Sequence, residues 1–132
     1  MVRIQPRRAK FEVHMKKKYL RVMADYMSTG LWNKEGANVE VENYNLAADT
    51  LLALSLWCAW YEKNDDYKDP VDRKVPAFDI KAFSEQGLVV AKMVKRDLPD
   101  FLIYYFDEYA LGKFGRGDDR LRYEYPVEEA RV

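Results

Sequence analysis

The clearest periodic pattern in this chain runs from residue 79 to residue 99. Apolar residues recur there at the spacing of one helix face, and they are Ile80, Phe83, Gly87, Val90, Ala91, Val94 and Leu98. This spacing predicts a helix over residues 80–98. Asp79 can cap its first turn, and Pro99 prevents its extension. Gly87 on the apolar stripe predicts a close approach to the sheet or to the preceding helix.

That preceding helix is predicted over residues 46–62, a stretch rich in Leu and Ala and too long for a strand. Residues 51–61 are apolar on nearly every side. Such a pattern is typical of a helix that is buried on most of its surface. Asn43 or Asn45 is expected to cap its first turn.

Two strands are predicted after the second helix. Residues 101–106 form a continuous apolar run that is too short for a helix, which indicates a central strand covered on both faces. Residues 121–127 alternate between apolar and charged side chains, which predicts a half-buried strand with a charged outer face. The glycines between these strands, Gly112, Gly115 and Gly117, indicate a turn.

The first third of the chain has weaker patterns. Residues 11–15 and 19–24 alternate broadly and could pair as a hairpin across residues 16–18. Residues 25–36 are rich in turn-forming side chains, and the alternation of Val and Glu over residues 39–42 indicates a short exposed strand. Together the patterns predict an α+β fold with two main helices packed on a mostly antiparallel sheet of four to five strands, and they leave the strand order open.

Length and composition are those of one globular domain spanning residues 1–132. The chain is 48% apolar and 33% charged, with no repeat and no Gly/Ser linker to divide it. Cys58 is the only cysteine, so no disulfide can form within the chain. The first ten residues lack the apolar core of a secretory signal, and no apolar run approaches the ~20 residues that span a bilayer. The sequence therefore predicts a cytoplasmic protein.

No arrangement of residues predicts a catalytic, metal or cofactor site. His14 and Cys58 are the only residues of their kinds and lie far apart, whereas metal sites need several converging ligands. Paired carboxylates occur at Asp65 and Asp66 and again at Asp118 and Asp119, without a context that predicts acid–base chemistry. We therefore expect a binding protein without cofactor, and an enzyme using unrecognised carboxylates is the less favoured alternative.

Charge is distributed unevenly although the total is zero. Residues 1–24 contain eight Lys or Arg and one Glu, a net charge of +7, and the remainder therefore carries −7. A basic segment containing Arg3, Arg7, Arg8 and residues 16–18 could contact phosphates, so a nucleic-acid-binding module is one alternative function. The basic residues could equally pair with the acidic remainder of the chain.

An acidic loop with a central tyrosine follows the first helix. Its candidate binding residues are Asp65, Asp66, Tyr67, Asp69 and Asp72. Carboxylates steer a basic partner and an aromatic side chain can anchor it, so the loop is a candidate protein-binding surface. A solvated loop without a partner is the alternative interpretation.

Several segments together carry a family resemblance. They are residues 28–32 (STGLW), 35–39 (EGANV), Trp57, 60–62 (WYE), 83–88 (FSEQGL), 98–101 (LPDF) and 104–108 (YYFDE). In this order they resemble small bacterial immunity proteins that accompany contact-dependent inhibition and other polymorphic toxins. The resemblance implies an inhibitor that binds its cognate toxin in the cytoplasm and covers the toxin's active or substrate-binding surface. Acidic residues would suit a basic nuclease toxin, and Trp32 is either an interface anchor or a core residue.

Overall fold

The structure, a computed structural model, describes residues 18–64, 71, 78–110 and 124–127. These residues form a four-stranded sheet with two long helices, which confirms the predicted α+β fold. The elements are β1 (Tyr19–Val22), β2 (Leu31–Trp32), the 3-10 helix η1 (Val41–Asn43), α2 (Ala48–Glu62), α3 (Ile80–Asp97), β3 (Leu102–Phe106) and β4 (Glu124–Pro126).

The sheet has the strand order β2-β1-β3-β4. Its two central strands are parallel, with Tyr19 opposite Leu102 and Val22 opposite Tyr105. The outer pairs, β1 with β2 and β3 with β4, are antiparallel, so two of the three pairings have the predicted direction. The short strand β2 lies within the stretch predicted to be irregular.

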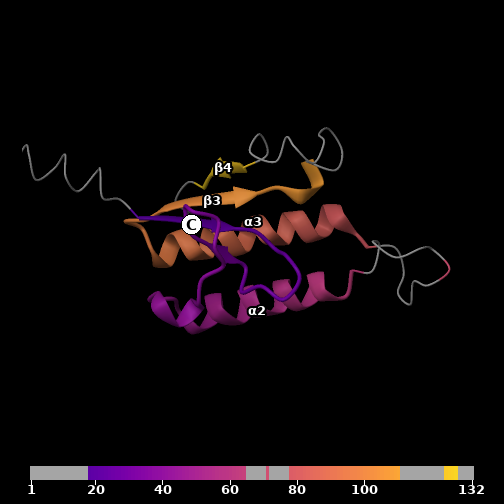
Figure 1. Cartoon of the computed structure of the whole chain (residues 1–132), viewed down its shortest axis with the longest axis horizontal. Helices are drawn as coiled ribbons and strands as arrows, with labels where there is room; N and C mark the ends of the chain where they lie inside the picture. The colour runs from indigo at the N-terminus through magenta and orange to yellow at the C-terminus, as the bar shows by residue number, and fades with distance from the viewer. Residues whose placement is uncertain (1–17, 65–70, 72–77, 111–123, 128–132) are drawn as a thin grey trace, which may run out of the picture.

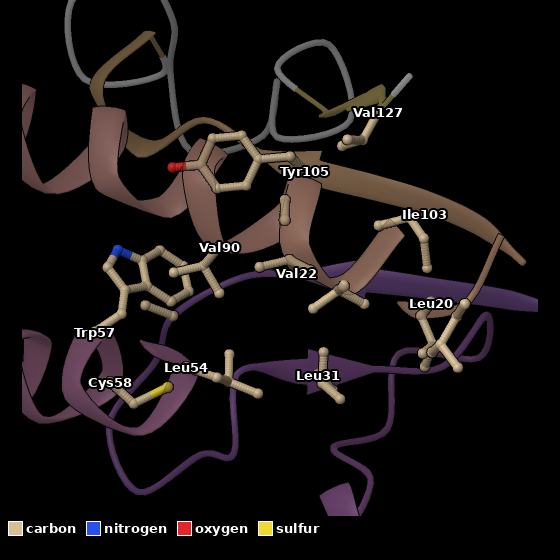
Figure 2. Packing of buried hydrophobic residues seen from close by; sticks show 14 of the residues in the cluster. Leu20, Val22, Leu31, Leu54, Trp57, Cys58, Val90, Ile103, Tyr105 and Val127 are labelled. Atoms are coloured by element: carbon tan, nitrogen blue, oxygen red, sulfur yellow. The ribbon is translucent and has the colours of Figure 1, made fainter. Parts of the chain in front are cut away.

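The hydrophobic core lies between the helices and one face of the sheet. Leu20 and Val22 on β1, with Ile103 and Tyr105 on β3, alternate toward this side and are buried. Figure 1 shows α3 lying between β3 and α2, and Figure 2 shows Leu54 and Cys58 of α2 pointing toward Leu31 of β2. The helix α2 therefore lies on the side of α3 that faces away from β3.

Gly87 makes the close approach that its place on the apolar stripe predicts. A Cβ atom at this position would come within 2.5 Å of the Trp57 ring on α2, and it would also collide with the hydroxyl of Tyr105 on β3. Both aromatic side chains donate hydrogen bonds to this turn of α3, Trp57 to the carbonyl of Phe83 at 3.0 Å and Tyr105 to that of Ser84 at 2.7 Å. The missing side chain lets α2, α3 and β3 meet at one point.

The two helices begin differently. Asp79 caps α3 as predicted, because its carboxylate accepts a hydrogen bond from the Ala82 amide at 3.0 Å. The predicted capping of α2 by Asn43 or Asn45 is wrong. Its N-cap is Ala47, whose amide donates to the carboxylate of Asp97, the last residue of α3, at 2.9 Å. A cap from a distant residue leaves no local signal in the sequence.

Two further predictions need correction, and others lie outside the described residues. Residues 41–43 form a 3-10 helix instead of a strand, because the chain turns there while Val39 and Val41 still pack against the core. β3 is central but not covered on both faces, since Leu102 is 40% exposed. The predicted strand at residues 11–15 and the glycine turn lie outside the described residues, as do residues 121–123 of the last strand.

Candidate partner-binding surface

The residues of the predicted acidic loop lie outside the described part of the structure. They are Asp65, Asp66, Tyr67, Asp69 and Asp72. The last described residue before them, Asn64, adjoins the turn after β1, where its carbonyl accepts a hydrogen bond from the Tyr26 hydroxyl at 2.6 Å. The residue that follows the C-terminal end of α2 by two positions therefore lies beside this turn.

Trp32 lies on the sheet face that points away from the helices. It pairs with Arg21, whereas the neighbouring pair, Val22 and Leu31, is fully buried on the helix side. Its ring is half-buried, and the indole N–H donates to the carbonyl of Met23 at 2.8 Å. Trp32 is thus outside the helix-side core, and its part in binding stays a prediction.

The same sheet face holds an internal polar cluster. Glu124 of β4 forms a salt bridge with Arg21 and accepts a hydrogen bond from the Tyr19 hydroxyl at 2.9 Å. Burial and this hydrogen bond raise the pKa of Tyr19 to about 12. The ring of Tyr19 also packs on that of Tyr104, with centroids 5.2 Å apart. The polar groups of this cluster therefore bind one another within the molecule.

The prediction that α2 is buried on most of its surface is wrong. Leu52 and Leu56 are each 61% exposed and Leu51 is 38% exposed. The core contacts of α2 come from its other side, where Thr50, Leu54, Trp57 and Cys58 are buried. We call the exposed residues Leu51, Leu52, Ser55 and Leu56 the α2 outer face.

A pocket adjoins the α2 outer face. It has a volume of about 210 Å³ and opens between α2 and the turn at Ser28 and Thr29. Leu51 and Ser55 of the α2 outer face line it together with Leu54, Cys58 and Val41. Its surface is mainly apolar, which suits an apolar side chain of a partner.

Met27 projects from the turn that borders this pocket. Its side chain is 93% exposed, and its backbone has φ of 58°, in the left-handed region that non-glycine residues seldom adopt. The Met27 amide donates to the carboxylate of Glu62 at 2.6 Å, and the Tyr26 ring packs on Tyr61 with centroids 4.9 Å apart. The C-terminal end of α2 therefore holds the turn in place.

The chain segment that builds this region is acidic. Residues 25–62 contain six carboxylates and Lys34 as their only Lys or Arg, a net charge of −5. Glu40 and Glu42 are exposed on either side of Val41, which lines the pocket. Two exposed carboxylates thus adjoin a residue of the pocket lining.

Two cations at the end of the predicted basic segment are engaged within the molecule. The Lys18 ammonium lies 5.5 Å from the centre of the Phe101 ring, and Arg21 is paired with Glu124. The remaining basic residues of that segment lie outside the described residues, as does His14.

Neither a metal site nor a reactive thiol is found in the described part of the chain. No group of three or more His, Cys, Asp or Glu converges among these residues. Burial, with a contribution from Glu62, raises the pKa of the Cys58 thiol to about 11, so the thiol stays protonated near neutral pH. None of the described helices is both long and apolar enough to cross a membrane.

A comparison with protein families identifies the chain. Residues 18–108, about two thirds of its length, match the model of the Serratia CdiI immunity protein-like family. The chain belongs to this family. Among curated proteins, none matches the chain significantly.

The part of the chain that matches the CdiI immunity protein-like family includes every element from β1 to β3. It contains the α2 outer face, the pocket, Met27 and the acidic loop. The basic residues before Lys18 and the strand β4 lie outside it. Sequence reasoning missed Leu52, Leu56 and Met27 as surface residues, although the lack of a polar side on α2 was a signal that could have found the two leucines.

Proposed function

We propose that this protein binds and neutralises a cognate toxin domain in the cytoplasm, by covering the toxin's active or substrate-binding surface. Membership of the CdiI immunity protein-like family carries the proposal, because the match spans both helices and three of the strands. Occlusion requires a stable complex and no turnover, so we expect no enzymatic activity and no cofactor.

The acidic character of residues 25–62 supports a basic partner. Residues 25–62 carry a net charge of −5. The loop that follows places Asp65, Asp66, Asp69 and Asp72 around Tyr67, interspersed with Lys63, Lys68, Arg73 and Lys74. Carboxylates facing a basic nuclease would resemble its nucleic-acid substrate and would accelerate association. We therefore propose a nuclease as the toxin, with these loop residues and Trp32 as candidate contacts.

Co-expression with the toxin encoded immediately upstream tests the function. We expect cells that produce this toxin to grow only when the present protein is also made, and the two proteins to purify together at a 1:1 ratio. An upstream product that is harmless, or that fails to bind at nanomolar concentration, would contradict the proposal.

A nucleic-acid-binding module is the alternative that the basic N-terminal residues suggest. Lys18 lies against the Phe101 ring and Arg21 is paired with Glu124, so these two cations support nucleic-acid binding less than their charge alone suggests. The alternative predicts binding to nucleic acid that weakens steeply with salt and falls when residues 16–18 lose their charge. Absence of binding at low salt would eliminate it.

A further inference from the structure

We propose that the toxin domain docks on the α2 outer face, and that it inserts an apolar side chain, flanked by Lys or Arg, into the adjoining pocket. Met27 forms one end of this docking surface. The inference rests on the proposed function. It adds a second contact surface, because the α2 outer face, the pocket and Met27 are separate in sequence from the loop residues and Trp32.

Apolar exposure on α2 is the first argument. Leu52 and Leu56 lie one turn apart, each 61% exposed, beside the partly exposed Leu51. Glu and Lys form helices almost as well as Leu, so helix formation does not require leucine at these positions. Adjacent exposed apolar side chains with a charged surround are typical of a protein-binding surface.

The pocket supplies a place for an anchor. Its lining includes the partly exposed Leu51 and Val41 and the buried Leu54 and Cys58, whose thiol is protonated. Glu40 and Glu42, the exposed neighbours of Val41 in the chain, bring carboxylates to this part of the surface. A partner side chain seated here would be apolar, and cationic residues beside that side chain would face these carboxylates.

The charge also selects the toxin over a second copy of this chain as the occupant. In a two-fold symmetric dimer through the α2 outer face, Glu40 and Glu42 would approach the same residues of the second copy, and like charges brought together are unfavourable. A cationic toxin domain meets the opposite charge. Charge complementarity therefore favours the heterologous complex.

Met27 is the second feature that the fold does not require and that a partner could contact. Its left-handed backbone could be adopted by glycine without strain, and its side chain is 93% exposed. The hydrogen bond to Glu62 nonetheless holds the turn beside the end of α2. Exposed methionine side chains adapt readily to an apolar partner surface.

The test measures the affinity of this protein for the toxin domain encoded immediately upstream, by calorimetry or biolayer interferometry. Leu52→Lys with Leu56→Lys places cations on the α2 outer face, Ser55→Phe fills the pocket, and Met27→Gly removes the exposed side chain without straining the turn. We expect each of the three variants to raise Kd at least about tenfold. Val89→Lys, at a residue of α3 that is 48% exposed, is the matched control and should leave Kd unchanged.

The outcomes separate the two proposals. If the wild-type protein does not bind the toxin, the proposed function fails. If it binds and all three folded variants retain its Kd within about twofold, the docking surface is wrong and the function stands. Gel filtration adds a further result that would overturn the inference, namely a wild-type dimer that becomes monomeric with Leu52→Lys and Leu56→Lys.

Discussion

Gly87 is the residue at which three elements come closest together. A methyl group there would collide with Trp57 and Tyr105, and both of these side chains are held by hydrogen bonds to α3. Neither neighbour can therefore move away without losing its own hydrogen bond. The residue has no side chain because the space is already filled from α2 and from β3.

We expect Gly87→Ala to lower the free energy of unfolding by about 2 kcal/mol, because overpacking outweighs the gain in helix propensity. Urea denaturation measures the change. Gly36→Ala is the matched control, since nothing lies within 4 Å of its added Cβ and only its positive φ of 85° is strained. We expect that control to lose about 1 kcal/mol. A Gly87→Ala protein as stable as the wild type would contradict the packing argument.

At the scale of elements, the junction between α2 and α3 depends on the carboxylate of Asp97. Its side chain is 7% exposed, and it accepts the Ala47 amide while also contacting Arg96. Burial by itself would raise the pKa of Asp97, but the hydrogen bonds from Thr50, Ala47 and Arg96 outweigh it and lower the pKa below its ordinary value of 3.8. The ionised carboxylate therefore stabilises the fold.

This stabilisation is complete only above about pH 5, where the unfolded carboxyl is also ionised, and it is lost as the pH falls through the lowered pKa, because the folded protein must then protonate a hydrogen-bonded carboxylate. We expect Asp97→Asn to be less stable than the wild type by about 1 kcal/mol at pH 7. The difference should shrink toward zero in acid, measured by urea denaturation from pH 7 to pH 2. Asp100→Asn, at an exposed residue, corrects for the general effect of removing one charge. A difference that stays constant over this range would refute the role of Asp97.

The elements differ in how far the sequence could predict them. α3 was predicted within one residue because Asp79 and Pro99 are local signals that bound a regular apolar stripe. The parallel pairing of β1 with β3 was not predictable, since it joins Tyr19 to Leu102 through the whole intervening chain. The two-residue strand β2 is too short to show alternation and depends on its pairing with Arg21 and Val22.

The candidate surface was only partly predictable for a related reason. The pattern of α2 shows that it lacks a polar side, and a helix of this kind can be covered either by its own chain or by another protein. The pattern predicts burial within the chain, whereas Leu52 and Leu56 are exposed. The acidic composition around them was visible in the sequence, but its place beside the pocket depends on the fold.

At the scale of the whole molecule, Cys58 reports on the integrity of the core and on docking. It is the only cysteine, it is 8% exposed, and burial raises its pKa to about 11. Only the thiolate attacks a disulfide reagent, so we expect the folded protein at pH 8 to react at least about 100-fold more slowly than the urea-unfolded chain. With dithiobis(nitrobenzoate) as the disulfide reagent, the absorbance of the released thionitrobenzoate measures both rates.

Comparable rates in the two states would show that the core around Cys58 opens freely. The reaction of the toxin complex provides a second measurement on the same thiol. Since Cys58 lines the pocket, occupation of the pocket should slow the reaction further, whereas a partner bound only elsewhere should leave the rate of the folded protein unchanged.

The parallel pairing at the centre of the sheet also bears on the synthesis of the protein. β1 emerges from the ribosome early, but its neighbour β3 is made only after both helices. The core therefore cannot close until residue 106 has left the exit tunnel. A newly made chain would consequently offer no folded docking surface until β3 has been made, so the proposed protection would depend on molecules that have already folded.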